Sequence, residues 1–219
     1  MICASITESL IDEMVETANS TDADIIEVRL DYLKGFEGLG ELRKIKNPLI
    51  ATCMPQWEGG RFRGGEAERI SILQEAITFS DYVSIELRTE EGLRNRIINE
   101  AKECGVKVIV SYHDFKKTPK REEILTIIGE EKAAGGGIAK IAFMPKDYLD
   151  VLRTMEVLLR DDLGIPVIAV SMGELGKISR ILGPLFGSYL TFASPDKGKE
   201  SAPGQLTVEE LRKILDSIS

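Results

Sequence analysis

The sequence has few of the residues that build metal centres. Its 219 residues include one histidine and three cysteines, Cys3, Cys53 and Cys104, which lie far apart and form no CxxC pair. A zinc cluster would need more Cys and His ligands at shorter spacing. We therefore expect no metal site, and an odd number of separated cysteines is typical of a reducing compartment.

Long apolar runs and an excess of basic residues are also missing. No segment approaches the ~20 apolar residues of a membrane span, and the N-terminus MICASI lacks the basic and apolar regions of a signal peptide. Lys and Arg number 28 against 36 Asp and Glu, a net charge of -8, which disfavours nucleic-acid binding. We expect a cytoplasmic protein with no membrane or nucleic-acid partner. A local basic pocket for an anionic small molecule is still compatible with this charge.

The chain instead contains eight short segments rich in Val, Ile and other strand-forming residues, with helical periodicity between them. Thr207 with Glu210 predicts a capping box, Thr118-Pro119 predicts a helix start, and the run Gly135-Gly136-Gly137 predicts a helix end. The predicted strands are Ile2–Ile6, Asp24–Leu30, Pro48–Met54, Tyr82–Leu87, Val106–Tyr112, Ile138–Phe143, Pro166–Ser171 and Tyr189–Ala193.

This alternation of strands and helices predicts the α/β class. Eight strand–helix units indicate parallel strands with helical crossovers, which can close into a (β/α)8 TIM barrel. We expect one barrel domain over residues 1–219. An open doubly wound sheet is the structural alternative, but no glycine fingerprint follows the first predicted strand.

The sixth predicted strand holds Lys140 between apolar residues, in the segment IAKIAF that begins at Ile138. Desolvation favours the neutral amine, which is a nucleophile toward a carbonyl and can form a Schiff base. A lysine that extends from a strand end into water is the plainer interpretation. This segment alone does not decide between the two.

His113 follows the fifth predicted strand and is the only histidine of the chain. Imidazole titrates near neutrality, so it can remove a proton and return it within one catalytic cycle. Ser111, His113 and Asp114 do not indicate a hydrolytic triad, because sequence neighbours rarely reach triad geometry and no GxSxG motif is present. A strand-end histidine without a catalytic role is the alternative.

Charged residues also interrupt the second predicted strand. Glu27 and Arg29 share one of its faces, and apolar residues occupy the other. We expect the apolar face to meet the helices and the charged pair to point into the barrel mouth. Inward charges are costly unless they are paired, so an internal Glu27–Arg29 salt bridge is the alternative to a ligand site. Glu86 repeats this pattern in the fourth strand.

Two late segments add further polar groups. Ser171-Met172-Gly173 follows the seventh predicted strand, and Arg180 behind it could bind a carboxylate through two parallel hydrogen bonds. The polar stretch Ser194–Gly204 joins the eighth strand to the last helix. It is either a lid over the barrel mouth or a plain surface connection.

In their order along nearly the whole chain, these segments resemble the type I 3-dehydroquinate dehydratase family. The resemblance implies a (β/α)8 barrel that needs no cofactor and converts 3-dehydroquinate to 3-dehydroshikimate and water in the shikimate route to aromatic compounds. The matching pieces are Ser5, EVR from Glu27, EGG from Glu58, SYHDF from Ser111, AKIAFMP from Ala139, SMGELGKISR from Ser171 and SAPGQ from Ser201.

The resemblance also implies a role for each matching residue. Lys140 would condense with the C3 ketone, and His113, oriented by Glu58, would remove the C2 proton and protonate the departing C1 hydroxyl in a syn elimination. The residues implied in substrate binding are Arg180 for the carboxylate, Ser201 and Gln205 from the lid, Ser5, Glu27 and Arg29 for ring hydroxyls, and Met172 and Phe192 as apolar walls.

One position departs from the family pattern. Many members have an arginine where this chain has Met54, and Arg61 or Arg63 is a candidate to replace it. Glu86 is a further candidate for substrate contact. A homodimer is common in the family, so self-association is an expectation by analogy.

Two other functions remain open from the sequence. A class I aldolase-like barrel shares the Schiff-base lysine but acts on phosphorylated sugars and usually has a glycine-rich phosphate site. Gly173 and Gly176 are the only hints of such a site. A catalytically inactive barrel that serves as a binding partner is the alternative from another class, and the intact lysine and histidine segments argue against it.

Overall fold

The computed structural model describes residues 1–218, and within them eight strands alternate with seven α-helices. The strands are β1 (Ile2–Ile6), β2 (Ile25–Arg29), β3 (Leu49–Thr52), β4 (Tyr82–Glu86), β5 (Lys107–Asp114), β6 (Ile138–Phe143), β7 (Val167–Ser171) and β8 (Thr191–Ala193). The helices are α1 (Ile11–Ser20), α2 (Glu66–Ile77), α3 (Glu91–Glu103), α4 (Arg121–Ala133), α5 (Tyr148–Met155), α6 (Gly173–Leu185) and α7 (Val208–Ile218). Short 3-10 helices lie at Leu30–Tyr32, Leu39–Lys44, Gln56–Glu58 and Glu156–Leu159.

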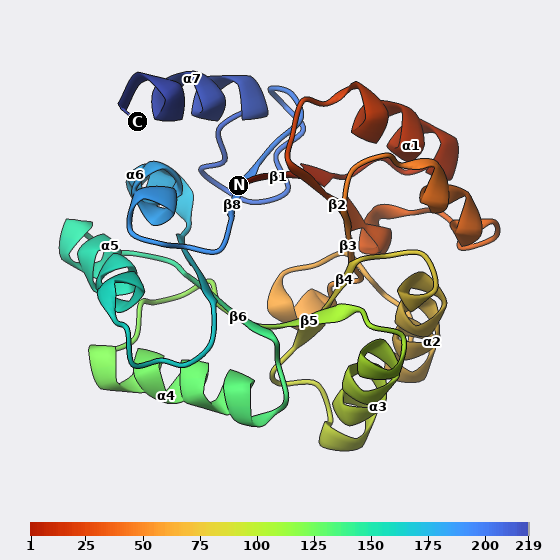
Figure 1. The fold of residues 1–219 in the computed structure, drawn as a ribbon, viewed down its shortest axis with the longest axis horizontal. Coiled ribbons are helices and arrows are strands. Elements are labelled where there is room, and N and C mark those ends of the chain that lie inside the picture. The colour runs from red at the N-terminus through yellow and green to blue at the C-terminus, as the bar shows by residue number, and fades with distance from the viewer. Residues whose placement is uncertain (219) are drawn as a thin grey trace.

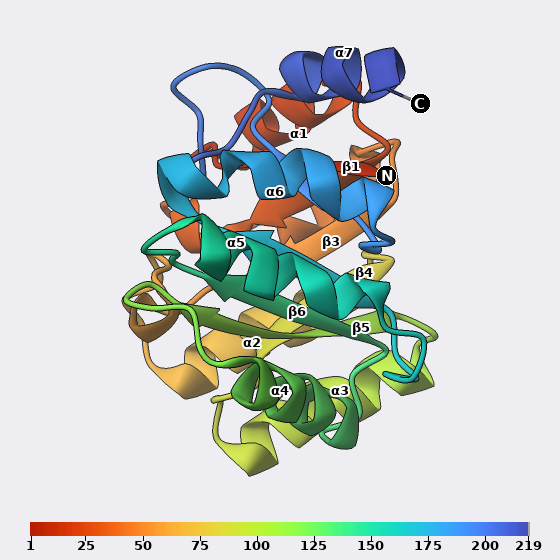
Figure 2. The ribbon, with the colours of Figure 1, turned by 90° about the vertical axis from the view of Figure 1, so that its left-hand side faces the viewer.

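The strands form one sheet in the order β7-β6-β5-β4-β3-β2-β1-β8, and the neighbouring strands pair in parallel. The backbone N–H of Tyr189 donates to the Val167 carbonyl at 2.9 Å, which links the segment before β8 to β7. The helices surround the strands (Figure 1), and α4, α5 and α6 lie beside one another along one flank (Figure 2). The prediction of a (β/α)8 barrel is confirmed, and the open sheet is excluded.

The inward and outward faces of the strands have different compositions. Outward residues such as Ile26, Val28 and Val110 pack against the helices in the largest apolar cluster. Inward residues near the amino ends of the strands fill the barrel interior; they include Ile25, Ile50, Ile109, Ile138 and Ile168. Because side chains alternate along a strand, the next inward positions lie closer to the carboxyl ends, where the polar residues are collected.

Two local predictions have different outcomes. The capping box is confirmed, because the Thr207 N–H donates to Glu210 Oε2 at 3.0 Å and the Glu210 N–H donates to Thr207 Oγ1 at 3.1 Å. The helix start at Thr118-Pro119 is wrong, because α4 begins at Arg121. The Thr118 hydroxyl donates to the Met144 carbonyl at 3.3 Å, so it ties down a loop and does not cap a helix.

Strand boundaries differ from the predicted ones by up to two residues. β1 and β6 match, whereas β3 ends at Thr52 and β5 continues to Asp114. The glycine run after α4 behaves as predicted, with Gly135 at a φ of 98°, in the left-handed region. In the described part of the chain, no helix is both long and apolar enough to cross a membrane.

Candidate active site at the carboxyl ends of the strands

A pocket with a cavity volume of about 130 Å³ opens at the carboxyl ends of the strands. Most of the site residues predicted from the sequence lie in its wall. Those residues are Ser5, Glu27, Arg29, His113, Lys140, Met172, Arg180, Phe192, Ser201 and Gln205. The wall also contains residues that were not proposed as contacts, namely Met54, Gly59, Phe115, Ala142, Val170, Ala202 and Pro203.

Lys140 lines the pocket, and the residue is only 6% exposed. Its Nζ is 3.8 Å from Glu27 Oε1 and 4.0 Å from the centroid of the Phe192 ring. Burial lowers the pKa of Lys140, while the Glu27 charge opposes this shift. A water-exposed lysine is therefore excluded, and burial makes the neutral, nucleophilic form of the amine easier to reach than it is in water.

Glu27 is held by two side chains from the neighbouring strands β1 and β3. Ser5 Oγ donates to Glu27 Oε2 at 2.6 Å, and Thr52 Oγ1 donates to Oε1 at 2.9 Å. Burial alone would raise its pKa, but the charges of Lys140 and Arg29 hold the pKa of Glu27 below its usual value. An ionised carboxylate thus lies beside the lysine amine.

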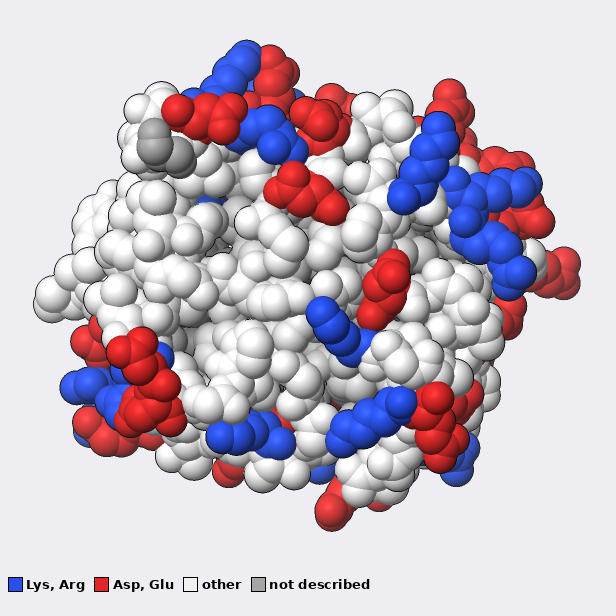
Figure 3. Space-filling view, viewed as in Figure 1, with Lys and Arg blue, Asp and Glu red and all other residues white. Residues whose placement is uncertain are grey.

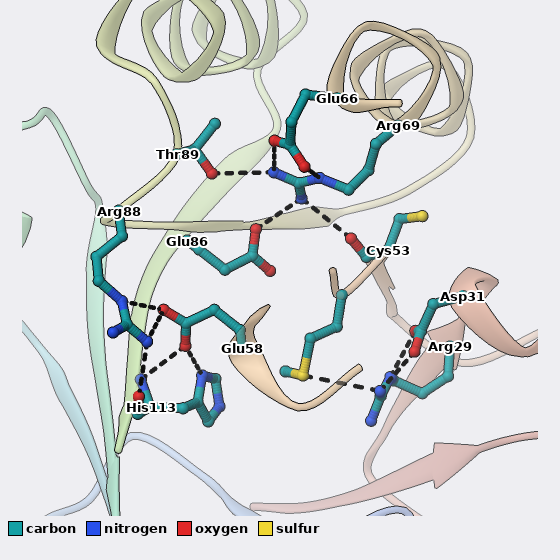
Figure 4. A network of polar contacts seen from close by, with 11 residues as sticks. Arg29, Asp31, Cys53, Glu58, Glu66, Arg69, Glu86, Arg88, Thr89 and His113 are labelled. Carbon is teal, nitrogen blue, oxygen red and sulfur yellow. Dashed lines mark hydrogen bonds and ion pairs between the residues drawn. The ribbon is translucent and has the colours of Figure 1, made fainter. Parts of the chain in front are cut away.

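Arg29 does not pair with Glu27 as the salt-bridge alternative supposed. Its Nε and Nη2 donate to the two oxygens of Asp31 at 2.8 Å each (Figure 4). Nη2 also lies 3.8 Å from the sulfur of Met54. Asp31 was missed in the sequence, although it stands only two residues after Arg29; its position beyond the end of β2 lets the side chain turn back toward the arginine.

His113 and Glu58 form a second buried pair (Figure 4). Glu58 Oε2 accepts the His113 backbone N–H at 2.9 Å and lies 3.0 Å from His113 Nδ1. A carboxylate only accepts, so the proton is assigned to Nδ1 and the Nε2 lone pair is free for a ligand in the pocket. Burial lowers the pKa of His113, and the hydrogen bond to Glu58 opposes this shift. The neutral imidazole at rest is suited to take up a proton.

Glu86 and Arg63 do not reach the pocket. Glu86 is fully buried behind the pocket wall, where its Oε2 accepts from Arg69 Nη1 at 2.6 Å, and Arg63 is exposed on the surface. Burial raises the pKa of Glu86 to about 7, although Arg69 opposes this shift. Arg69 comes from α2 and was missed, because its position on a helix predicted a solvated side chain.

Arg61 lies at the pocket mouth, unlike Arg63. Its guanidinium stacks 4.2 Å over the Tyr32 ring, and its backbone N–H donates to Asp31 Oδ2 at 2.9 Å. It borders a hollow next to the pocket that Lys177 and Gln205 also line. Of the two arginines considered as replacements near Met54, only Arg61 is placed to meet a ligand.

Arg180 is a buried cation without an acidic partner among residues 1–218. Its guanidinium donates to the carbonyls of Gly204 at 2.8 Å, Phe192 at 3.1 Å and Pro203 at 3.3 Å. These three acceptors leave some of its N–H donors unused. Burial lowers the pKa of Arg180 to about 10. A desolvated positive charge with spare donors is suited to a carboxylate ligand.

The segment after β8 covers part of the pocket. Ser201, Ala202, Pro203 and Gln205 contribute to its wall, and the Ser201 N–H donates to Gln205 Oε1 at 2.7 Å. Gly204 has a φ of 78°, and a Cβ there would lie 2.1 Å from the Gly173 carbonyl oxygen. Only glycine fits this close approach, which brings the segment against the start of α6. The segment is therefore more than a surface connection.

The site is built from single groups of different chemistry. Among residues 1–218, no three His, Cys, Asp or Glu side chains gather as metal ligands would. What is gathered is one desolvated amine, one imidazole with a carboxylate behind it, and one desolvated guanidinium. This set can bind a small anionic carbonyl compound, form an imine with it and move a proton.

Comparison with known proteins gives one consistent result. The sequence profile described as type I 3-dehydroquinase matches residues 2–219. The 3-dehydroquinate dehydratase of Methanococcoides burtonii is 42% identical, over 93% of this chain and 88% of its own, and that of Methanocaldococcus jannaschii is 40% identical, over 98% and 97%. The crystal structure of the Clostridium difficile type I 3-dehydroquinate dehydratase with covalent modified comenic acid has a TM-score of 0.90 and 31% identity, over 99% of this chain and 91% of that one.

Proposed function

Because this chain belongs to the type I 3-dehydroquinase family and is a 3-dehydroquinate dehydratase, a carbon–oxygen hydro-lyase, we propose that it works through a Schiff base on Lys140, with His113 as the proton carrier. The observation that carries the proposal is the buried Lys140 amine, whose pKa burial lowers, in the same pocket as the only imidazole of the chain. The covalent ligand in the Clostridium difficile relative supports covalent chemistry in this family.

The proposed reaction begins with imine formation. The neutral Lys140 amine adds to the C3 ketone of 3-dehydroquinate to give a carbinolamine. The hydroxyl group of the carbinolamine takes a proton from the solvent and leaves as water, which gives an iminium ion. The iminium withdraws electrons from the adjacent carbon and so acidifies the C2 hydrogen. Glu27, 3.8 Å from the amine, stabilises the positive charge of this intermediate.

His113 then carries out the elimination. Its Nε2 removes the C2 proton, and the resulting imidazolium returns a proton to the C1 hydroxyl, which leaves as water. Hydrolysis of the conjugated iminium consumes one water, releases 3-dehydroshikimate and one proton, and restores the neutral amine. Glu58 fixes the Nδ1 proton, so that the imidazole begins each cycle with its base toward the pocket.

The remaining residues of the pocket wall would bind the substrate. Arg180 would bind the carboxylate, because its buried charge has no acidic partner in residues 1–218. Ser201 and Gln205 would close over the ligand. Ser5, Glu27 and Arg29 would contact ring hydroxyls, and Met172 with Phe192 would pack against the ring. Arg61 at the mouth would add positive charge near the position of Met54.

Borohydride reduction tests the covalent step. Borohydride added during turnover of 3-dehydroquinate should reduce the imine and leave a stable mass increase on the peptide that contains Lys140. The Lys140→Met variant should stay unlabelled, whereas Lys177→Met, which removes a lysine from the hollow beside the pocket, should still be labelled. An unlabelled wild type with full turnover would reject the imine.

The same experiment separates the roles of the two residues. His113→Ala should still form the reducible imine, because it keeps the amine, but should lose about 10²–10⁴-fold of its turnover. Loss of labelling in this variant, with the fold intact by circular dichroism, would show that His113 serves imine formation as well as proton transfer.

We also propose that the chain forms a homodimer through α5 and α6. Large apolar side chains are exposed there, and the surface over these helices carries little charge in Figure 3. Two copies of a chain with net charge -8 can meet at such a surface without strong repulsion. The exposed residues are Tyr148 (63%), Leu149 (68%), Leu152 (55%), Leu159 (63%), Ile178 (39%) and Leu185 (48%).

Sedimentation velocity tests the homodimer. The wild type should sediment as a dimer and Leu149→Glu as a monomer. Leu10→Glu, at a 48% exposed site just before α1, should remain dimeric. A monomeric wild type at micromolar concentration would contradict the proposal.

A further inference from the structure

Arg88, which follows β4 closely in the sequence, contacts both members of the Glu58–His113 pair (Figure 4). Its Nε donates to Glu58 Oε1 at 2.7 Å, and its Nη2 donates to the His113 carbonyl at 3.0 Å. The other oxygen of Glu58 accepts from the backbone and faces the ring of His113. The three residues therefore form a closed set of contacts, in which Arg88 fixes Glu58 relative to the backbone of His113.

Aromatic rings hold the guanidinium of Arg88 in place. Its Cζ lies 4.7 Å from the centroid of the Tyr112 ring and 5.8 Å from that of Trp57. The Arg88 side chain is 43% exposed, whereas that of Glu58 is fully buried. Arg88 thus stands between a buried carboxylate and the solvent, and it supplies the positive charge that a desolvated carboxylate requires.

We infer that Arg88 is a positioning residue for the proton-transfer step. It holds the Glu58 side chain aligned with His113, so that Nδ1 holds its proton and Nε2 faces the substrate. Arg88 acts through Glu58 and is absent from the pocket wall. The inference rests on the proposed role of His113, and its first test below needs no substrate.

Loss of the Arg88 charge should change how His113 titrates. A nearby cation disfavours proton uptake by an imidazole. Without Arg88, His113 should take up its proton at a higher pH. The other charged or titratable groups that act on the Glu58–His113 pair are Lys140, Arg29, Glu86, Tyr112 and Glu131, and none of them changes in the variants below.

Arg94 offers a matched control. It lies nearby on α3 and, like Arg88, binds backbone carbonyls, in this case those of Leu87 at 2.5 Å and Thr89 at 3.4 Å. Within residues 1–218, these hydrogen bonds do not involve Glu58 or His113. Arg94→Met therefore removes an arginine and its backbone contacts from the same region and leaves the pair untouched.

The first test is the titration of His113 in the free protein. His113 is the only histidine, so its ring signals in an NMR spectrum need no assignment by mutation. In Arg88→Met the midpoint of the His113 titration should move to higher pH by about 1 unit. We expect a shift at the low end of the range for a neighbouring charge, because solvent screens the partly exposed Arg88. Arg88→Lys should keep most of the wild-type titration, and Arg94→Met all of it. An unchanged titration in Arg88→Met would overturn the inference, whatever the fate of the Schiff-base proposal.

The second test is kinetic. Arg88→Met should lower kcat by about 10–100-fold and change KM less than about twofold, because alignment of the base is lost and substrate binding is not. The acid limb of kcat/KM should move to higher pH with the NMR titration. Arg88→Lys should recover only part of kcat, because an ammonium cannot reach both acceptors as the guanidinium fork does.

A double variant shows whether Arg88 acts through Glu58. Glu58→Gln combined with Arg88→Met should be no slower than Glu58→Gln alone, because the residue that Arg88 positions has already lost its charge. If the decreases in kcat of the two single variants multiply in the double variant, Arg88 has a role that is independent of Glu58, and the inference is rejected. An equal fall of kcat in Arg94→Met, with a matching fall in Tm, would also reject it in favour of a general loss of stability.

Discussion

The two halves of the barrel interior are built from the same strands and are equally buried, yet their chemistry is opposite. Toward the amino ends, inward positions carry Ile25, Ile50, Ile109 and Ile138. Two residues further along the same strands, the inward positions carry Glu27, Thr52, Ser111 and Lys140. Burial therefore does not by itself select apolar residues in this protein.

The difference shows what buried polar side chains need in order to be stable in the barrel interior. Glu27 has hydrogen-bond partners on both neighbouring strands, Ser5 and Thr52, and these bonds offset part of the cost of desolvation. The apolar half below needs no such partners and supplies rigidity. Its dry packing also places Lys140 where water is scarce, which lowers the pKa of the amine.

The sharpest way to test this division is to replace the charged group on β6. Lys140→Met keeps a long side chain in the same space but removes the nucleophile. We expect kcat to fall by more than about 10⁴-fold, since no other amine is placed to form the imine. The measurement is the rise of enone absorbance from the product. Residual turnover within a hundredfold of wild type would contradict the assignment of Lys140.

The matching change in the apolar half is Ile138→Ala, two residues earlier on the same face of β6. Here we expect the free energy of unfolding to fall by about 2–5 kcal/mol, because the substitution leaves a cavity in a packed interior. Turnover per folded molecule should stay near that of wild type. Urea unfolding and kcat, measured on the same preparation, test both expectations. A large loss of kcat without a loss of stability would mean that the two halves do not act separately.

Glu86, beside Ser111 in the polar half, should make stability depend on pH. Its pKa in the folded chain is about 7 against an ordinary value of 4.5, chiefly because of burial. The folded protein then binds an extra proton between these values, so the free energy of unfolding should fall as pH rises through this range, by roughly 3 kcal/mol. Urea unfolding at pH 5 and pH 8 should show this slope in wild type and its loss in Glu86→Gln. Parallel pH profiles for the two proteins would contradict the expectation.

Glu131 on α4 is a buried carboxyl group outside the polar half. Among the described residues neither of its oxygens has a hydrogen-bond partner of good geometry, and burial raises its pKa well above the ordinary value. Glu131→Met should therefore raise the free energy of unfolding by about 1–3 kcal/mol at pH 7 and leave kcat unchanged. Thermal unfolding monitored by circular dichroism is the measurement. A loss of activity would connect this carboxyl to the site.

Much of the site could be predicted from the sequence because its residues interrupt apolar strands. Lys140 and Glu27 stand out as charges at strand positions, and alternation along β2 correctly placed Glu27 and Arg29 in the pocket wall. Glu86 interrupts β4 in the same way but lies outside that wall, because Arg69 reaches it from α2. The pattern shows that a charge points inward, and it does not show what meets it there.

The sequence by itself determined the succession of strands and helices along the chain, because this depends on periodicity along single segments. It also singled out Lys140, which interrupts an apolar strand, and His113, which is the only histidine. Only the tertiary structure decided that Arg29 pairs with Asp31, that Arg88 holds Glu58, and that Arg180 is left without an acid in residues 1–218. These contacts join segments that meet at the barrel mouth or turn back on themselves. The partner of each residue is set by the distance between side chains in space, which the spacing of residues in the sequence does not give.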